Sequence, residues 1–201
     1  MQVLALSGSL RAASINTALL HAAARLAPPG MTVQVFGGIA DLPLFNIDLE
    51  QSVPAPVAAL RAAVAGADAL LIASPEYAHG VSGVMKNTLD WLVSLESFVG
   101  KPVALLNAQP RAQFSDPALR EILTTMSANL VQPASIALTL TADTLTEAGM
   151  LASKSVSAAV KAAMVALHSR QSQPASYDQA VYPLESASTL SGRQGLEVAS
   201  E

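Results

Sequence analysis

Short apolar runs alternate with longer stretches of helical periodicity along the first 170 residues. In the stretch 15–27, Ile15, Leu19 and Leu26 recur at a spacing that places them on one face of a helix. Most of the short runs are apolar on both faces, as strands covered by helices on each side should be. The pattern predicts strands at 3–7, 32–36, 69–74, 102–108 and 135–140, and helices near 15–27, 54–66, 82–95, 116–130 and 146–170.

This alternation indicates the fold class. Five strand–helix units in series predict an α/β fold with a doubly wound parallel sheet, right-handed crossovers and helices on both faces. Prolines and glycines mark the helix ends: Pro28, Pro29 and Gly30 follow the first predicted helix, and Gly66 ends the second. The sequence shows no internal repeat and no linker, so we expect residues 1–170 to form one domain.

The stretch 171–201 differs from the rest of the chain. It is rich in Ser, Gln and Ala, it has no sustained periodicity, and its four acidic residues stand against Arg193, so it carries −3 of the chain's −4. We expect a mobile tail. The alternative is an arm packed on a neighbouring subunit, anchored by Tyr177, Tyr182 and Leu184.

Composition and charge exclude several classes of protein. The chain has no cysteine, which excludes disulfides, thiolate metal sites and cysteine nucleophiles and suits a reducing cytoplasm. The net charge of −4 lacks the basic excess of a nucleic-acid binder. The amino terminus reads as a buried strand rather than a secretory signal, and charges interrupt the apolar runs, so we expect a cytoplasmic protein without membrane contact. The three histidines are too scattered to predict a metal site.

Ligands of a doubly wound sheet bind at the carboxyl ends of its strands, and the loop after the first predicted strand suits a phosphate. Backbone N–H groups at a helix N-terminus and a nearby guanidinium both attract phosphate oxygens. The loop lacks the Gly-Lys-Ser/Thr ending of a P-loop and the three-glycine dinucleotide fingerprint, so a monophosphate is favoured. The alternative is that Ser14 or Asn16 only caps the helix. The polar side chains of this first loop are Ser7, Ser9, Arg11, Ser14 and Asn16.

Two further loops leave carboxyl ends of predicted strands. The second loop, 74–80, contains Tyr77 and His79, which suit the edge of a flat ring, although rim packing and solvent exposure are the alternatives. The third loop, 107–111, offers the amide of Gln109 and the guanidinium of Arg111. Because the three loops leave the same edge of the sheet, we expect them to form one site.

Motifs in these loops resemble the NADPH-dependent FMN reductase family, which includes quinone, azo-dye and chromate reductases. The resemblance covers about residues 1–170 in order and spacing. The matching stretches read Gly8-Ser9-Leu10-Arg11-x-x-Ser14-x-Asn16, Asp41-Leu42-Pro43-Leu44-Phe45-Asn46, Pro75-Glu76-Tyr77 and Gly83-x-x-Lys86-Asn87-x-x-Asp90-Trp91.

The resemblance implies a flavodoxin-like sheet with strand order 2-1-3-4-5 and a bound FMN. The residues that it places at the phosphate are Ser9, Arg11, Ser14, Ile15 and Asn16. Those that it places along the ribityl chain and ring are Pro75, Glu76 and Tyr77. From their places in the second and third loops, we also expect Ala78, His79, Gln109 and Arg111 to contact the cofactor. It also implies NADPH or NADH as co-substrate and a homodimer or homotetramer with the helix of Lys86 and Trp91 near the interface. Trp91 as a core residue is the alternative.

Three positions depart from the family pattern, and all lie near the ring. Ala78 stands where the family usually has Asn, Ser82 where it usually has Pro, and Gln109-Pro110-Arg111 where it has small residues and glycines. The phosphate loop is intact, so we expect FMN binding with altered ring contacts.

The resemblance implies a ping-pong transfer of reducing equivalents from the nicotinamide to a small acceptor, such as a quinone, free flavin, an azo compound or a metal oxyanion. Such chemistry needs no catalytic acid, base or nucleophile from the protein, and the sequence offers no Gly-x-Ser-x-Gly elbow. Three alternatives stay open: a reductase that uses FMN as a diffusible substrate, a flavodoxin-like electron carrier, and a non-enzymatic flavin sensor or scaffold. The near-neutral body of the chain disfavours the carrier, which needs an acidic docking field.

Overall fold

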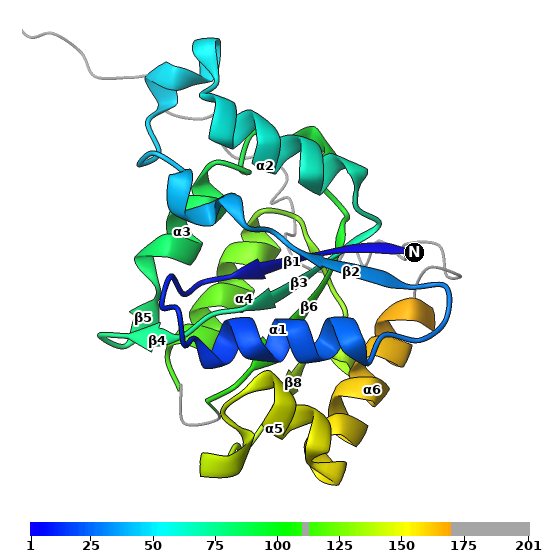
Figure 1. The fold of residues 1–201 in the computed structure, drawn as a ribbon. Helices are drawn as coiled ribbons and strands as arrows, with labels where there is room; N and C mark the ends of the chain where they lie inside the picture. Colours follow the sequence, from blue (N-terminus) through cyan, green and yellow to red (C-terminus); the bar gives the residue numbers. More distant parts are fainter. Residues whose placement is uncertain (110–112, 170–201) are drawn as a thin grey trace, which may run out of the picture.

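The computed structural model describes residues 1–109 and 113–169, and a parallel sheet lies at its centre (Figure 1). The order across the sheet is β2-β1-β3-β6-β7, with β8 also paired to β6. This is the predicted order 2-1-3-4-5, with β6 in the fourth position. The strands are β1 (Gln2–Ser7), β2 (Thr32–Val35), β3 (Ala69–Ala73), β6 (Pro102–Asn107), β7 (Asn129–Leu130) and β8 (Ile136–Ala137).

Helices cover both faces of the sheet (Figure 1). On one face lie α1 (Ile15–Arg25), α5 (Glu147–Ala152) and α6 (Lys154–Ser169), and on the other lie α2 (Ala55–Gly66), α3 (Gly83–Asp90) and α4 (Ser115–Thr125). Successive strand residues point to opposite faces. Val3 and Ala5 therefore pack in the core under α1, whereas Leu4 and Leu6 pack in the core under α2. The all-apolar strand pattern thus reflects burial on both sides.

The register brings the ends of the central strands together. Ser7 at the end of β1 pairs with Ala73 at the end of β3, and Leu105 of β6 pairs with Ile72 of β3. The loops after these strands consequently leave one edge of the sheet, on the left in Figure 1. The prediction that the carboxyl ends converge is confirmed.

The fifth strand differs from its prediction. Of the strand predicted at 135–140, only β8 (Ile136–Ala137) forms, and the end of the helix predicted at 116–130 is instead the short strand β7. These two pieces pair with successive parts of β6, and the 3₁₀ turn η4 (Gln132–Ala134) separates them. Pro133 lies within this turn. Proline has no backbone N–H to donate to a neighbouring strand, so a continuous ladder is interrupted there.

Three helices are shorter than their apolar periodicity predicts. The helix predicted at 82–95 is α3, which ends at Asp90. The predicted helix at 116–130 ends at Thr125, and Ser127 just beyond it adopts a left-handed φ of 60°. The predicted helix at 146–170 is two helices, because Ser153 is extended and breaks the run between α5 and α6. Periodicity alone does not register such breaks, since the apolar face continues on either side of them.

Three features complete the fold. A second small sheet, absent from the predictions, pairs β4 (Glu76–Tyr77) with β5 (Gly80–Val81). No helix among the described residues is long and apolar enough to cross a membrane. The expected tail at 171–201 and the expected ligand residue Arg111 lie outside the described residues.

Candidate functional site

The first loop, between β1 and α1, is braced by its own hydroxyls. Ser14 is the N-cap of α1, and its hydroxyl accepts a hydrogen bond of 3.2 Å from the backbone N–H of Thr17. The Ser7 hydroxyl lies 2.7 Å from the Thr17 hydroxyl, which links the end of β1 to the first turn of α1. The Ser9 hydroxyl accepts from the backbone N–H of Arg11 at 3.4 Å. Helix capping, the alternative to phosphate binding, therefore explains why a hydroxyl stands at Ser14.

Capping does not account for Asn16 or Arg11. Asn16 is buried, with 4% of its surface exposed, and its side-chain oxygen has no hydrogen-bond partner. Buried polar groups are nearly always paired, so an unpaired one at a loop of this kind indicates a missing ligand. The amide of an Asn can be turned by 180° to present its NH₂ to an acceptor. Arg11 is exposed, and the ion pairs formed within the described residues do not include it.

The N-terminus of α1 adds to this donor set. Its first turn contains no acidic residue, so the positive end of the helix dipole is not neutralised by the chain itself. A phosphate group supplies the negative charge and the acceptor oxygens that these donors lack. The first loop therefore fits the phosphate of FMN, and Asn16, Arg11 and the first-turn N–H groups are the residues that would hold it.

The first and second loops touch at Gly8. Its N–H donates to the carbonyl of Ala73 at 2.8 Å, which extends the pairing of β1 with β3 by one residue. A Cβ at Gly8 would lie 2.4 Å from the Ser74 hydroxyl oxygen and 2.9 Å from that of Ser82. Glycine is required there because the two loops approach too closely for a side chain.

The second loop is a β-hairpin with a strained turn. β4 and β5 are joined by Ala78 and His79, whose φ angles are 49° and 58°. Two successive residues with positive φ are the signature of a type I′ turn, which favours Asn followed by Gly. Neither Ala78 nor His79 is of a residue type that readily adopts this conformation, so the turn is strained. Backbone strain of this kind is concentrated at functional sites.

We predict that Ala78→Gly stabilises the protein by about 1 kcal/mol, since a Cβ is unfavourable in the left-handed region. Urea unfolding measures the difference. Ala62, exposed in the middle of α2, provides a control of opposite sign, because Ala62→Gly should lower the unfolding free energy by about 1 kcal/mol. A destabilised Ala78→Gly variant would contradict the strained turn.

The second loop is fastened to the start of α4 by Glu76. Its side-chain oxygen accepts hydrogen bonds from the backbone N–H groups of Phe114 at 2.9 Å and Ser115 at 2.8 Å. The N-cap residue of α4 is Phe114, whose side chain cannot accept a hydrogen bond from the first backbone N–H groups of the helix. The Glu76 carboxylate, from a distant part of the chain, caps the helix instead. In addition, the His79 ring stacks on the Phe114 ring with centroids 4.3 Å apart. The hairpin and the end of the third loop are therefore one unit.

The hydrogen bond from Ser115, with smaller contributions from Phe114 and nearby His79, lowers the pKa of Glu76 below its usual value of 4.5. A carboxyl with a depressed pKa in the folded state stabilises the fold above its unfolded pKa and ceases to do so as the pH falls through its folded value. We predict that the stability gap between wild type and Glu76→Gln is constant above about pH 5 and shrinks below pH 4.5. Urea unfolding across this range, with Glu121→Gln on exposed α4 surface as control, measures it. A gap that is unchanged down to pH 3 would contradict the assigned role of the carboxylate.

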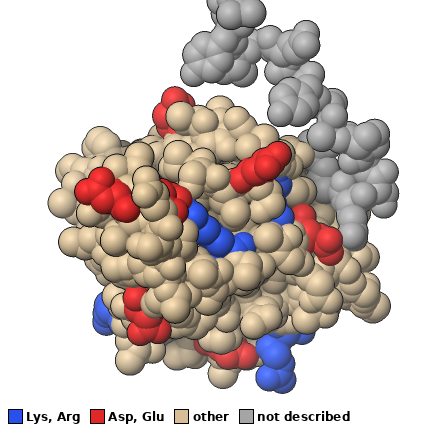
Figure 2. Space-filling view, turned by 90° about the horizontal axis from the view of Figure 1, so that it is seen from above, with Lys and Arg blue, Asp and Glu red and all other residues tan. Residues whose placement is uncertain are grey.

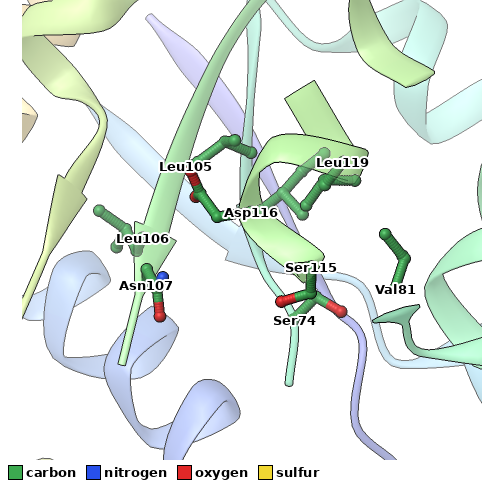
Figure 3. A pocket seen from close by; sticks show the side chains of 9 residues that line it. Ser74, Val81, Leu105, Leu106, Asn107, Ser115, Asp116 and Leu119 are labelled. Carbon is green, nitrogen blue, oxygen red and sulfur yellow. The ribbon is translucent and has the colours of Figure 1, made fainter. Parts of the chain in front are cut away.

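A small recess separates β3 and β6 from α4 at this edge of the sheet (Figure 3). Ser74, Asn107 and Ser115 give its opening a polar rim at the strand ends, and Leu105 and Leu119 lie deeper (Figure 3). The carboxyl ends of neighbouring strands thus border a small hollow lined by both polar and apolar side chains, and Asp116 lies beside Leu105 in it (Figure 3).

The segment after β2 is held by α3. Asn87 accepts from the N–H of Phe45 at 2.8 Å and donates to the carbonyl of Pro43 at 3.0 Å, and the Trp91 indole N–H donates to the same carbonyl at 2.8 Å. Trp91 is fully buried, which confirms it as a core residue, and the ring of Phe45 packs edge-on against it at 5.0 Å. Lys86 and Asp90 pair with each other along the helix, where an exposed ion pair contributes little.

The charged side chains form no single-sign field on the face that carries α2. Figure 2 shows acidic and basic groups interspersed on a largely uncharged surface. Among them, Arg61 is paired with Glu50 at 2.6 Å and also donates to the Ser94 hydroxyl. On this face of the described residues, charges of both signs therefore lie close to one another.

The expected ligand residues fall into two groups. The phosphate-loop residues are contiguous, with Ser14 and Asn16 buried, Ser9 and Ile15 half-buried, and Arg11 exposed. In the second loop Pro75 is buried, Glu76 is half-buried, and Tyr77, Ala78 and His79 are exposed, while Gln109 is exposed in the third loop. Sequence reasoning did not single out Thr17, Ser74 or Phe114. Of these three residues, only Thr17 could have been found from the sequence, because it lies three positions after Ser14, the cap of the helix.

The sheet order is that of a flavodoxin-like domain, and the loops at the ends of β1 and β3 are its candidate binding site. Residues 1–143 match the family model described as NADPH-dependent FMN reductase, and the chain belongs to that family.

Curated relatives carry related names. The chain is 42% identical over 111 residues to the NAD(P)H-dependent FMN reductase of Pseudomonas aeruginosa, a match covering 54% of this chain and 60% of the relative. It is 39% identical over 109 residues to the quinone reductase of Escherichia coli, covering 52% and 58%. The chain thus matches less than two thirds of the length of either relative.

Solved structures match over more of the chain. The flavoenzyme NAD(P)H:(acceptor) oxidoreductase FerB of Paracoccus denitrificans superposes with a TM-score of 0.68 at 27% identity, covering 84% of this chain and 97% of that one. An NADH:FMN oxidoreductase in its apo form gives a TM-score of 0.63 at 20% identity, covering 86% and 91%, which shows the shared fold.

Proposed function

We propose that the chain is an FMN-dependent oxidoreductase that takes reducing equivalents from NADPH or NADH and passes them to a small acceptor. The observation that carries this proposal is the buried, unpartnered side-chain oxygen of Asn16 in the first turn of α1, in the same loop-to-helix segment as the exposed Arg11. Membership of the family and the names of the relatives support the nicotinamide and FMN. When bound, FMN supplies the hydride chemistry.

The residues of this chain then position the cofactor and exclude competing reactions. Arg11, Asn16 and the first-turn N–H groups bind the phosphate, whose charge matches the helix dipole. The hairpin of Tyr77 and His79 is fastened to α4 through Glu76, and its second strand contributes Val81 to the wall of the recess (Figure 3). A wall held by two hydrogen bonds and a ring stack keeps its shape when ligands enter and leave, which suits an alternation of two substrates.

The visible absorbance spectrum of freshly purified protein, before and after NADPH is added under nitrogen, tests the proposal. We expect a flavin spectrum, at purification or after FMN is added, that bleaches with NADPH and returns with an acceptor. A quinone, an azo dye and chromate are the acceptors to compare, because the relatives' names include quinone reductases. A protein that does not bind added FMN would contradict the proposal and favour a scaffold. Binding without bleaching would favour a sensor or an electron carrier.

We also propose that the chain forms a homodimer or homotetramer through the segment 44–47. Leu44 is 83% exposed and Ile47 71% exposed, although Asn87 and Trp91 hold the adjoining residues firmly. Large apolar side chains on an ordered segment suit a subunit interface. Light scattering after gel filtration should show an oligomer that Leu44→Lys/Ile47→Lys weakens, and a monomeric wild type would contradict the interface.

The lack of cysteine supports a cytoplasmic location, which cell fractionation tests.

A further inference from the structure

A buried hydroxyl joins α3 to the phosphate loop. Ser82 precedes α3 and is 1% exposed. Its hydroxyl donates to the carbonyl of Gly8 at 2.7 Å, accepts from the backbone N–H of Met85 at 3.2 Å, and lies 3.2 Å from the Ser74 hydroxyl. Capping of α3 needs only the bond from Met85. The bond to Gly8 spans 74 residues of sequence and has a separate consequence.

Hydrogen bonds hold both the carbonyl and the N–H of the peptide unit between Gly8 and Ser9. Its carbonyl accepts from Ser82, while its N–H, on Ser9, donates to the Ser7 hydroxyl at 3.3 Å. Ser7 in turn shares a hydrogen bond of 2.7 Å with Thr17 on α1. Because a peptide unit is planar, holding both ends fixes its direction. The first peptide of the phosphate loop is therefore set by α1 on one side and α3 on the other.

The space around this peptide allows little movement. The Ser74 and Ser82 hydroxyls fill the position that a side chain of Gly8 would take. The residues that follow, Ser9 to Ser14, begin from this fixed peptide and end at the N-cap of α1. Fixing both ends of a short loop lowers the entropy that it loses when it closes on a ligand.

We propose that Ser82 is a positioning residue for the phosphate of FMN, acting through the Gly8 carbonyl. This inference rests on the proposed function, because it assumes that the first loop binds FMN. Ser82 thus connects the helix after the ring-binding loop directly to the phosphate site.

The test compares Ser82→Ala with Thr88→Val. Thr88 is the matched control because it is a fully buried hydroxyl on the same helix and donates only within it, to Val84 at 2.8 Å. Circular dichroism first establishes that wild type and both variants are folded at the temperature used. FMN affinity is then measured by quenching of flavin fluorescence. Hydrogen–deuterium exchange of residues 8–14 is measured in the protein without FMN.

We expect Ser82→Ala to raise the FMN dissociation constant about 3- to 10-fold, as loss of one hydrogen bond to the loop predicts. Exchange in residues 8–14 should accelerate in the same variant, and Thr88→Val should change neither quantity. Equal FMN affinity and equal loop exchange in the two variants would overturn the positioning role and leave the proposed function intact. A wild type that binds no FMN would instead overturn the proposed function, and the inference would fall with it.

Discussion

Replacement of Arg11 by Ala is expected to raise the dissociation constant of FMN by about 10- to 100-fold. A hydrogen bond to a charged group is worth about 1.5–3 kcal/mol, and a guanidinium can make two parallel bonds to one phosphate. Arg11 is exposed and does not enter the ion pairs of the described residues, so no internal partner competes with a phosphate for it. Titration of the protein without FMN by flavin fluorescence measures the change.

Two control variants show whether a loss of FMN affinity is specific to Arg11. Arg25→Ala removes the same charge from the far end of α1, where Arg25 lies in the last turn, and should leave FMN affinity within about twofold of wild type. His79→Ala removes an exposed ring that stacks on Phe114 rather than a phosphate ligand, so its effect should be much smaller than that of Arg11→Ala. If Arg11→Ala and His79→Ala retain FMN equally, the phosphate-loop assignment is wrong.

The second large effect is expected from Gly8→Ala. A Cβ there would lie 2.8 Å from the Cβ of Ser74 and 2.4 Å from its hydroxyl oxygen, so the ends of β1 and β3 must move apart. Overpacking of this kind costs about 1–3 kcal/mol of unfolding free energy. It also displaces the first peptide of the phosphate loop, so FMN affinity should fall together with stability. Urea unfolding and FMN titration of the same variant measure both quantities.

Gly83 provides the matched control for Gly8. It is the first residue of α3, one position after Ser82, and a Cβ there meets nothing within 4 Å. Gly83→Ala should therefore be neutral or stabilising by up to about 1 kcal/mol, because Ala favours a helix over Gly. A Gly8→Ala variant as stable as Gly83→Ala would show that the two loops do not approach as closely as the structure indicates.

The convergence of the loops that form the candidate site was predictable from the sequence, but the contacts between those loops were not. The order of apolar runs placed the phosphate loop at the end of β1 and the hairpin loop at the end of β3, because parallel strands end at a common edge. For Glu76, by contrast, the family resemblance implies only a place along the ribityl chain and ring. Its side chain caps α4 across 39 residues of sequence, and no local pattern encodes a cap supplied from a distance.

The class of fold and the polar groups of the first loop can be read from the amino-acid sequence alone, because both depend on local properties. Apolar periodicity sets which segments are strands or helices, and a run of hydroxyl, amide and guanidinium groups before a helix is visible in one stretch of the chain. Only the tertiary structure decided what joins the loops: the bond from Ser82 to Gly8, the strained turn at Ala78 and the stack of His79 on Phe114. The energies of these contacts depend on distances between residues far apart in the chain, and those distances exist only once the sheet has brought the strand ends together.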